Sequence, residues 1–320
     1  MYPRFVDRAE ELRSLEELAS TGFYPILYLY GPEGCGKTRL LHELRRRLGE
    51  KPGYLVVYVD AEEASDPREA VRAAPEVASE LLEALGEAAG PPGRMLARLL
   101  PSLLKRLRER LVAGRRVVVL VDEVARPLGL DAIEQYAKKL LDALEALYER
   151  GARSVLILAT TSEGLSRRLL ARHNYAALAE VWNLGRDAYE ELLEALGAPR
   201  DARGDAWLAT GGNPRFTLML SSLGWRVERL EAWVERRVRA LLGGLLRSQR
   251  DALLAAVEDV DVLEERPSLA EALLEANLVI PIDRPCLGYT PPPDPELGIG
   301  ERYAWQAPVY MRVVHRLAGG

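Results

Sequence analysis

Uninterrupted apolar runs alternate with helical patterns over the first two hundred residues. Runs of this kind, without a polar residue at every second position, are typical of strands buried on both faces. The predicted strands are 24–30, 54–59, 117–121 and 155–159, with a weaker fifth at 178–184. Helices are predicted between them at 38–48, 67–85, 94–112 and 131–148, with a Gly/Pro break at 90–93. Helical crossovers between buried strands indicate a parallel sheet and a three-layer α/β domain over residues 1–185.

From about Arg186 onward the pattern is helical, with no strand before residue 278. The predicted helices are 187–196, 203–209, 214–223, 226–242 and 246–257. A short helix at 268–275, a strand at 278–282, a Pro/Gly-rich excursion at 285–300 and a return strand at 303–306 follow. Helix, helix and a long-tipped hairpin is the order of a winged helix. We therefore predict a helical lid subdomain over 186–243 and a winged-helix domain over 244–320.

Composition excludes several classes of protein. The chain has 320 residues, of which 48% are hydrophobic, so it is long enough for two domains and too apolar to be disordered. No apolar run is long enough to span a membrane. Acidic residues at positions 7, 10 and 11 interrupt the stretch that would be apolar in a signal peptide, which predicts a cytoplasmic protein. Few amides beside many Glu and Arg fit either a heat-adapted source or GC-rich coding.

The net charge of −5 argues against gripping nucleic acid as the main task, although a local basic patch stays compatible with it. The two cysteines, Cys35 and Cys286, are too few for a zinc site, and inside a cell they are expected to be thiols.

Residues 31–38 read GPEGCGKT and match G-x-x-x-x-G-K-S/T, between a predicted strand and a predicted helix. Such a loop aims backbone N–H groups at a polyphosphate, and the helix N-terminus adds its positive dipole end. Lys37 is expected to reach the β- and γ-phosphates, and the Thr38 hydroxyl is expected to bind Mg²⁺. The alternative is a Gly-rich turn with a surface lysine. The candidate phosphate-binding residues are Gly31, Pro32, Gly34, Cys35, Gly36, Lys37, Thr38 and Arg39.

The strand at 117–121 runs directly into Asp122 and Glu123. Ligands of open α/β sheets bind outside the carboxyl ends of the strands, so these side chains are placed for chemistry. Asp122 is expected to hold Mg²⁺ through water, and Glu123 to orient and deprotonate the attacking water. Alone, the pair would be read as a solvated acidic turn; together with the P-loop it favours hydrolysis.

The base is expected to be adenine, because no Asn-Lys-x-Asp tetrad for guanine occurs. At 160–162, Thr-Thr-Ser would sense the γ-phosphate or position water, or would simply end a strand.

These motifs together resemble a known family. Residues 5–12, FVDRAEEL, resemble the hydrophobic-x-G/D-R-x-x-E-L segment of STAND-class and related AAA+-like ATPases, and 210–215, TGGNPR, resemble the Gly-x-Pro motif of the archaeal ATPase branch. The resemblance implies ATP or ADP with Mg²⁺ as cofactors. It implies that Phe5, Val6 and Arg8 frame the adenine with Pro214, and that Arg215 approaches the γ-phosphate. In the alternative, Phe5 is a core anchor and Pro214 only starts a helix.

An arginine finger acting in trans is compatible with Arg167, Arg168 or Arg172, which follow the fourth strand as in AAA+ relatives.

Two functions follow from this order of motifs. In one, Mg-dependent ATP hydrolysis drives a conformational switch between core and winged helix, with a protein partner or self-association. In the other, the protein is a DNA-binding AAA+ ATPase resembling archaeal replication initiators. The candidate recognition helix, 268–277, carries two acids and no base. Arginines at 226–250 are interleaved with Glu228, Glu231 and Glu235, as in a solvated helix. The switch is therefore favoured over DNA binding.

Overall fold

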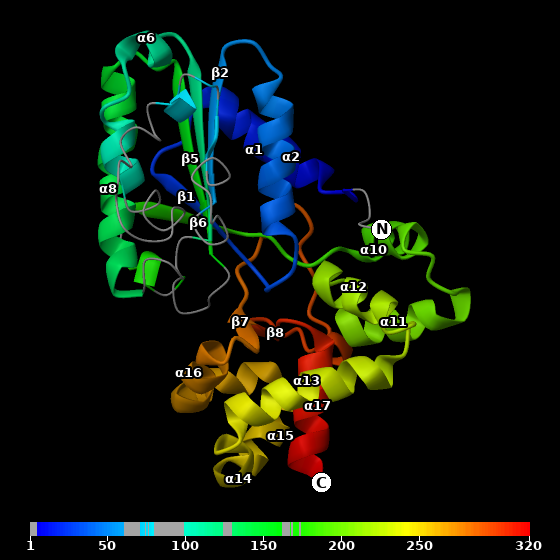
Figure 1. Cartoon of the computed structure of the whole chain (residues 1–320). Helices are drawn as coiled ribbons and strands as arrows, with labels where there is room; N and C mark the ends of the chain where they lie inside the picture. Colours follow the sequence, from blue (N-terminus) through cyan, green and yellow to red (C-terminus); the bar gives the residue numbers. More distant parts are fainter. Residues whose placement is uncertain are drawn as a thin grey trace. The chain divides into compact units, whose positions relative to one another are not determined.

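The order of the strands decides which strand ends meet at one edge of the sheet. A computed structural model describes residues 5–60, 71–73, 75, 77–79, 99–123, 130–161, 167, 169–172 and 174–320. In that part of the chain, a six-stranded sheet has the order β3-β2-β4-β5-β1-β6 (Figure 1). The strands are β1 (Ile26–Tyr30), β2 (Tyr54–Asp60), β3 (Val71–Arg72), β4 (Arg116–Asp122), β5 (Ser154–Thr160) and β6 (Ala176–Glu180).

Strands β2, β4, β5 and β1 pair in parallel, which confirms the predicted parallel α/β sheet. Register aligns their carboxyl ends: Asp60 pairs with Asp122, and Leu29 pairs with Thr160. The fifth predicted strand is present as β6, shifted toward the N-terminus. The polar residues that end β2, β4 and β5 therefore lie along the edge at which β1 runs into Gly31.

Helices cover both faces of this sheet. The long helix α8 (Leu130–Glu149) lies on one face, and α1 (Ala9–Thr21) and α2 (Lys37–Gly49) lie on the other (Figure 1). Helix α1 was not predicted as a helix, although its buried Leu12, Leu15 and Ala19 have helical spacing. The three-layer arrangement predicted from the sequence is thus present.

Two helix predictions before β4 need correction. Residues 71–72 were predicted to be helical but form β3, which pairs antiparallel with the edge of β2. An edge strand offers unpaired backbone groups, and pairing with them overrides local helical pattern. The predicted helix 94–112 is broken: in its described part, residues 99–104 are helical, a turn follows, and α6 occupies Glu109–Val112. The rest of 67–85 and 90–98 lies outside the described residues, apart from residue 73, which lies in a bend, and helical positions at 75 and 77–79.

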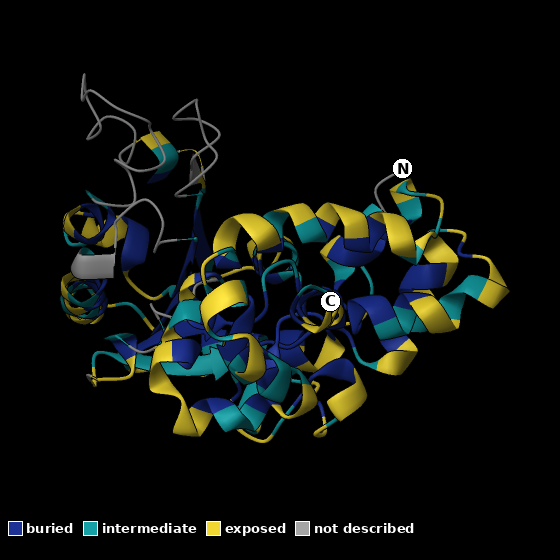
Figure 2. Ribbon diagram, turned by 90° about the horizontal axis from the view of Figure 1, so that it is seen from below, coloured by how far each residue is buried: buried dark blue, intermediate teal, exposed yellow. Residues whose placement is uncertain are grey.

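The pattern of buried residues differs between the strands and the helices. Every residue of β1 and β5 is buried, and so are the central residues of β2 and β4. Helices instead show a buried side and an exposed side, seen as alternating dark blue and yellow in Figure 2. This contrast is what continuous apolar runs and helical periodicity predict.

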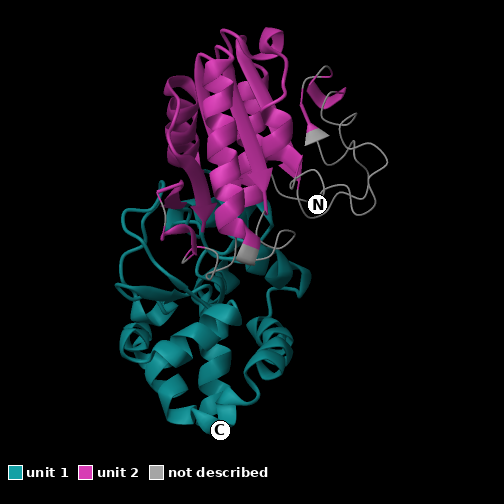
Figure 3. Cartoon of the chain, turned by 90° about the vertical axis from the view of Figure 1, so that its left-hand side faces the viewer, with its two compact units in different colours: residues 1–7, 31–36, 180–320 teal, residues 8–30, 37–179 magenta. Residues whose placement is uncertain are grey.

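The chain divides into two compact units (Figure 3). One comprises 8–30 and 37–179, and contains the helices that cover the six-stranded sheet. The other comprises 1–7, 31–36 and 180–320. A single hydrophobic core in the latter extends from Leu184 to Ala318. The separate lid and winged-helix boundaries predicted at 186, 243 and 244 stay a prediction.

The unit containing 180–320 is mainly helical. Its helices are α10 (Arg186–Ala195), α11 (Arg203–Thr210), α12 (Pro214–Ser222), α13 (Val227–Leu242), α14 (Leu245–Ser248), α15 (Arg250–Glu258), α16 (Pro267–Glu275) and α17 (Pro308–Gly319). Strands β7 (Val279–Pro281) and β8 (Tyr303–Trp305) form an antiparallel hairpin. The helix predicted at 246–257 is broken at Gln249, which leaves the helical region (φ −130°, ψ 36°). Helix α17 was not predicted.

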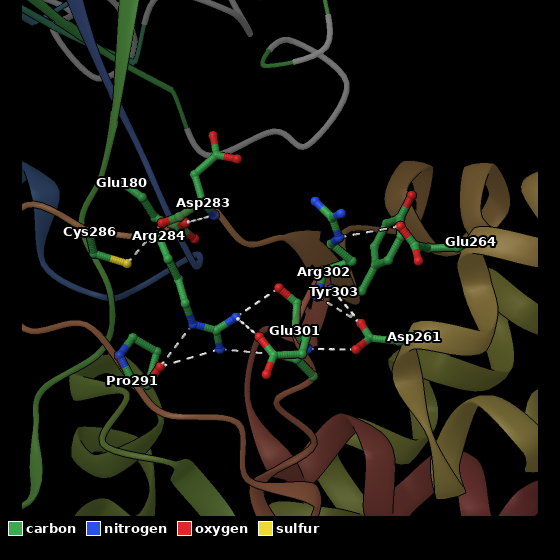
Figure 4. Close-up of polar contacts among 11 residues, drawn as sticks. Glu180, Asp261, Glu264, Asp283, Arg284, Cys286, Pro291, Glu301, Arg302 and Tyr303 are labelled. Carbon is green, nitrogen blue, oxygen red and sulfur yellow. Dashed lines mark hydrogen bonds and ion pairs between the residues drawn. The ribbon is translucent and has the colours of Figure 1, made fainter.

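The long tip of the hairpin is tied down by side chains (Figure 4). The Arg284 guanidinium donates to the carbonyls of Pro291 and Gly300 at 3.3 and 2.9 Å. The Asp261 carboxylate accepts backbone N–H groups of residues 301–303 at 2.5 to 2.9 Å. These bonds satisfy backbone groups of an excursion whose regular part is a short 3-10 helix, η3 (Pro295–Leu297), and so give it a defined path. Among the described helices, none combines the length and apolar character that crossing a bilayer requires.

Candidate functional site

The carboxyl ends of β4 and β5 are joined through Asp122, which is only 4% exposed. The Thr160 hydroxyl donates to Asp122 Oδ1 at 2.6 Å and accepts the Glu123 N–H at 2.9 Å. The Tyr58 hydroxyl, at the end of β2, donates to Asp122 Oδ2 at 3.1 Å. Each carboxylate oxygen thus has one protein donor and keeps lone-pair capacity for a water or a metal ligand sphere.

Glu123, the residue after β4, has an unusual backbone conformation. Its φ of 51° lies in the left-handed region, which residues other than Gly, Asn and Asp rarely adopt. Strained backbone of this kind concentrates at functional sites. Glu123 follows directly after the buried strand β4, and its catalytic role stays a prediction.

The surroundings of Asp122 keep its neighbours in defined protonation states. Burial raises the pKa of the Tyr58 hydroxyl well above its ordinary value, and the Asp122 charge adds to the rise. Tyr58 therefore stays a proton donor. The His42 ring lies 4.8 Å from the Tyr58 ring, edge to face. Burial lowers the pKa of His42, and nearby Arg72 lowers it further, so this imidazole is neutral at pH 7.

Lys37, Thr38 and Arg39 form the first turn of α2. That turn has no acidic residue, so the positive end of the helix dipole is not neutralised by its own side chains. Helix α2 packs on β2 and β4. The Lys37 residue is 5% exposed, whereas Thr38 is exposed. A helix N-terminus with a lysine and a hydroxyl fits the phosphate and Mg²⁺ chemistry predicted for this motif.

The backbone of 31–36 belongs to the unit with 180–320, and close neighbours there require two of its glycines, Gly31 and Gly34. A Cβ on Gly31 would lie 2.0 Å from the Val181 carbonyl oxygen, and one on Gly34 would lie 2.5 Å from Arg215 Cβ. A Cβ on Gly36 would meet no atom within 4 Å, but the φ of 106° disfavours a side chain there. All three glycines were predicted to allow close approach of the ligand. Two of them, Gly31 and Gly34, also allow close approach of other residues of the protein.

Buried Cys35 fixes the loop to the same segment. Its thiol donates to the Val181 carbonyl at 3.4 Å, and its N–H donates to the Pro32 carbonyl at 3.1 Å. The thiol is fully buried, and the cysteine therefore acts here as a packing residue.

Glu33 was not predicted as a site residue, yet three groups converge on its carboxylate. Arg215 pairs with it at 2.6 Å, Arg237 at 3.4 Å, and the Asn277 amide donates to it at 3.1 Å. A carboxylate inside a phosphate-binding loop is electrostatically unfavourable unless it is neutralised. The presence of an acidic residue within the motif was therefore the sequence signal that could have identified Glu33. Arg215, predicted to approach the γ-phosphate, has Glu33 as its ion-pair partner here.

The predicted adenine-binding residues occupy distinct surroundings. Val6 packs against the core of the 180–320 unit. In the sheet-containing unit, Arg8 is buried and pairs with Glu11 at 2.7 Å. Asp7 and Arg8 are both left-handed, with φ of 53° and 70°. Pro214 is the first residue of α12, and Phe5 is partly buried; their contact with adenine stays a prediction.

Of the hydroxyls at the end of β5, Thr160 contacts Asp122 and the Thr161 N–H donates to the Leu29 carbonyl at 3.0 Å, while Ser162 lies outside the described residues. The guanidinium of Arg167 lies over the Tyr30 ring, 5.1 Å from its centroid. Arg168 lies outside the described residues, and the finger stays a prediction.

The model of a family described as an ATPase domain predominantly from Archaea matches residues 5–220. No curated protein gives a significant match.

Solved structures similar to this chain include Cdc6p from Pyrobaculum aerophilum, at 15% identity over 99% of this chain and 97% of that chain, with a TM-score of 0.43. A RuvB variant from Thermotoga maritima is 16% identical over 88% and 91%, with a TM-score of 0.42. Domain III of the replication initiation protein DnaA from Thermotoga maritima is 17% identical over 69% and 88%, with a TM-score of 0.39. Because the family model spans more than half of the chain, the protein belongs to this family of ATPase domains found predominantly in Archaea.

Proposed function

We propose that the protein binds ATP and hydrolyses it in a Mg²⁺-dependent reaction. One observation carries the proposal: β5 lies between β1, which leads into the P-loop, and β4, which ends in Asp122. Register places the ends of these strands along one edge of the sheet, with Thr160 bonded to Asp122. Phosphate-binding and metal-holding groups meet at such an edge in open α/β sheets.

The roles follow from the chemistry of each group. Lys37 and the N–H groups at the start of α2 would bind the β- and γ-phosphates. The Thr38 hydroxyl and Asp122 would hold Mg²⁺, which supplies neutralisation of phosphate charge when bound. Glu123 would accept the proton of the attacking water, and Thr160 would hold the backbone of Glu123 in place.

The remaining contacts that we propose for the nucleotide rest on the family resemblance. Phe5, Val6, Arg8 and Pro214 would frame adenine. Arg215 would move from the Glu33 carboxylate to the γ-phosphate, because both are anionic and the arginine side chain is 57% exposed and able to reorient.

We further propose that nucleotide state changes the conformation of 180–320, in the manner of a STAND-class switch with a winged helix at its C-terminal end. The supporting observation is Glu33: this P-loop residue contacts Arg215 of α12, Arg237 of α13 and Asn277 after α16. A ligand that alters the loop acts on these elements through contacts that already exist. A protein partner or a second copy of the chain would respond to this conformational change.

DNA binding has less support. Helix α16 carries no basic residue within Pro267–Glu275. Arg237 and Arg239 are paired with Glu33 and Glu235, and Arg250 donates to carbonyls at the end of α17. Arginines held in intramolecular contacts are less available for phosphates of a duplex.

The test uses purified protein and two variants. Glu123→Gln keeps the size of the side chain and removes the base, so we expect nucleotide affinity within about twofold of wild type and turnover lower by about 100-fold or more. Glu134→Gln, on α8, is the matched control for charge loss. Hydrolysis should require Mg²⁺ and should be unchanged by duplex DNA at low salt. DNA-stimulated turnover would favour the alternative, and equal turnover in Glu123→Gln and wild type would contradict the assignment.

A further inference from the structure

We infer that Gln306, at the end of β8, is a positioning residue for the phosphate-binding loop; the inference rests on the proposed nucleotide site. Gln306 Oε1 accepts the backbone N–H of Glu33 at 2.7 Å. The two residues are 273 positions apart in the sequence and belong to the same compact unit. Gln306 is 1% exposed, so water is a poor substitute partner for this N–H.

The other side of the Glu33 backbone is held as well. Asn213, fully buried, donates from Nδ2 to the Glu33 carbonyl at 2.9 Å. A peptide unit is planar and trans, so fixing the Glu33 carbonyl also fixes the direction of the Gly34 N–H, which points the opposite way. Gln306 likewise fixes the plane between Pro32 and Glu33. The two peptide planes that lead into the loop are therefore set by side chains outside it.

The two amides are themselves oriented. We call Asn183, Asn213, Asn277 and Gln306 the amide cluster. Asn213 Nδ2 donates to Asn183 Oδ1 at 2.9 Å, and Asn183 Nδ2 donates to the Gln306 carbonyl at 3.0 Å. Gln306 Nε2 donates to Asn277 Oδ1 at 2.5 Å. Buried amides are stable only when their hydrogen bonds are satisfied, and here the bonds orient each donor and acceptor.

The cluster also reaches the Glu33 side chain. Asn277 is left-handed (φ 55°) where α16 ends, and its Nδ2 donates to Glu33 Oε2 at 3.1 Å. The hairpin and the end of α16 thus hold both the backbone and the carboxylate of one P-loop residue. Nucleotide binding that needs this loop conformation must stabilise the hairpin, and the hairpin must strengthen nucleotide binding, because linkage is reciprocal.

The test compares Gln306→Leu with its neighbour Trp305→Phe in the full chain. Trp305 donates from its indole N–H to the Ala256 carbonyl, on α15, at 3.2 Å. Trp305→Phe therefore destabilises the same hairpin without releasing Glu33. We expect Gln306→Leu to weaken Mg·ADP binding roughly 5- to 100-fold, as for a buried donor left unpaired. Trp305→Phe should bind Mg·ADP as wild type does.

Hydrogen exchange supplies a readout that general destabilisation does not move. In Gln306→Leu, the amide of Glu33 should exchange faster than in Trp305→Phe at matched stability. In wild type, Mg·ADP should slow exchange in residues 278–306. If the leucine variant does not fold, Gln306→Asn, which keeps the amide but shortens its reach, should show the same loss.

Failure of this inference can be told from failure of the proposed function. If wild type binds Mg·ADP, Lys37→Ala does not, and Gln306→Leu binds like wild type, the positioning role is overturned alone. Equal losses in Gln306→Leu and Trp305→Phe would also overturn it. A wild-type chain that binds neither ADP nor ATP would overturn the proposed function and, with it, this inference.

Discussion

Thr160 connects Asp122 to Glu123: its hydroxyl donates to the Asp122 carboxylate at 2.6 Å and accepts the Glu123 N–H at 2.9 Å. One side chain from β5 thereby holds both the last residue of β4 and the residue that follows it. In the proposed reaction these are the metal-holding acid and the general base, so their relative placement depends on the Thr160 hydroxyl.

Thr160→Val should separate this positioning role from folding. Valine keeps the branched shape and removes both hydrogen bonds, so we expect the Mg²⁺ requirement of ATP hydrolysis to rise about 10- to 100-fold, as when an outer partner of a metal ligand is lost. Ser154→Ala is the matched control, because Ser154 is a buried hydroxyl at the other end of β5 that donates to the Ala19 carbonyl. Equal Mg²⁺ dependence in the two variants would count against the role of Thr160.

Gly34→Ala should disable the loop by steric conflict. Gly34 has a φ of 84°, and the added Cβ would lie 2.5 Å from Arg215 Cβ. We expect Mg·ADP affinity to fall more than about tenfold, beyond the cost of about 1 kcal/mol for a left-handed alanine. Gly197→Ala is the control, since Gly197 is also left-handed (φ 69°) but has open space around it. A fluorescence titration with labelled ADP distinguishes them, and identical affinities would exclude the steric account.

Periodicity and motif order predicted the sheet, most helices and the P-loop, because these depend on local pattern and on short-range rules. The contacts of Glu33 were not predictable in the same way. Its partners Arg215, Asn277 and Gln306 come from distant elements, and no spacing rule links an amide on a hairpin to a loop near the N-terminus. Helix α17, by contrast, was predictable from the sequence. Pro308 at its start and the helical spacing of Val309, Val313 and Val314 indicate a helix there.

Glu231→Gln should reduce stability without affecting the nucleotide site. The Glu231 side chain, on α13, is 11% exposed and pairs with Arg312 at 2.8 Å and Arg316 at 2.7 Å on α17. Because both arginines are nearly half exposed and can be solvated, we expect the free energy of unfolding to fall by only about 1 kcal/mol. Urea denaturation measures it. Glu228→Gln, an exposed charge on the same helix, is the control; an equal effect there would show that the ion pairs contribute nothing specific.

His42 should make stability depend on pH in a defined direction. Burial lowers its pKa in the folded state below 6.5, so folding favours the neutral ring. The unfolded chain then binds more protons below pH 6.5, and this contribution to stability is present above that pH and lost as pH falls. We expect His42→Gln to lose less unfolding free energy than wild type between about pH 7.5 and about pH 5.5. His315→Gln controls for removal of an exposed imidazole, and identical pH slopes in wild type and His42→Gln would refute the expectation.

The most direct measurement is calorimetric titration of Mg·ATP into wild type, Lys37→Ala and Lys51→Ala. Lys37 opens α2 in the P-loop motif, whereas Lys51 lies just beyond the other end of that helix and pairs with Glu16 at 2.7 Å. We expect wild type and Lys51→Ala to bind with equal affinity and Lys37→Ala to bind at least about tenfold more weakly. Absence of binding in wild type, or equal affinity in both lysine variants, would contradict the assignment of residues 31–38 as the polyphosphate site.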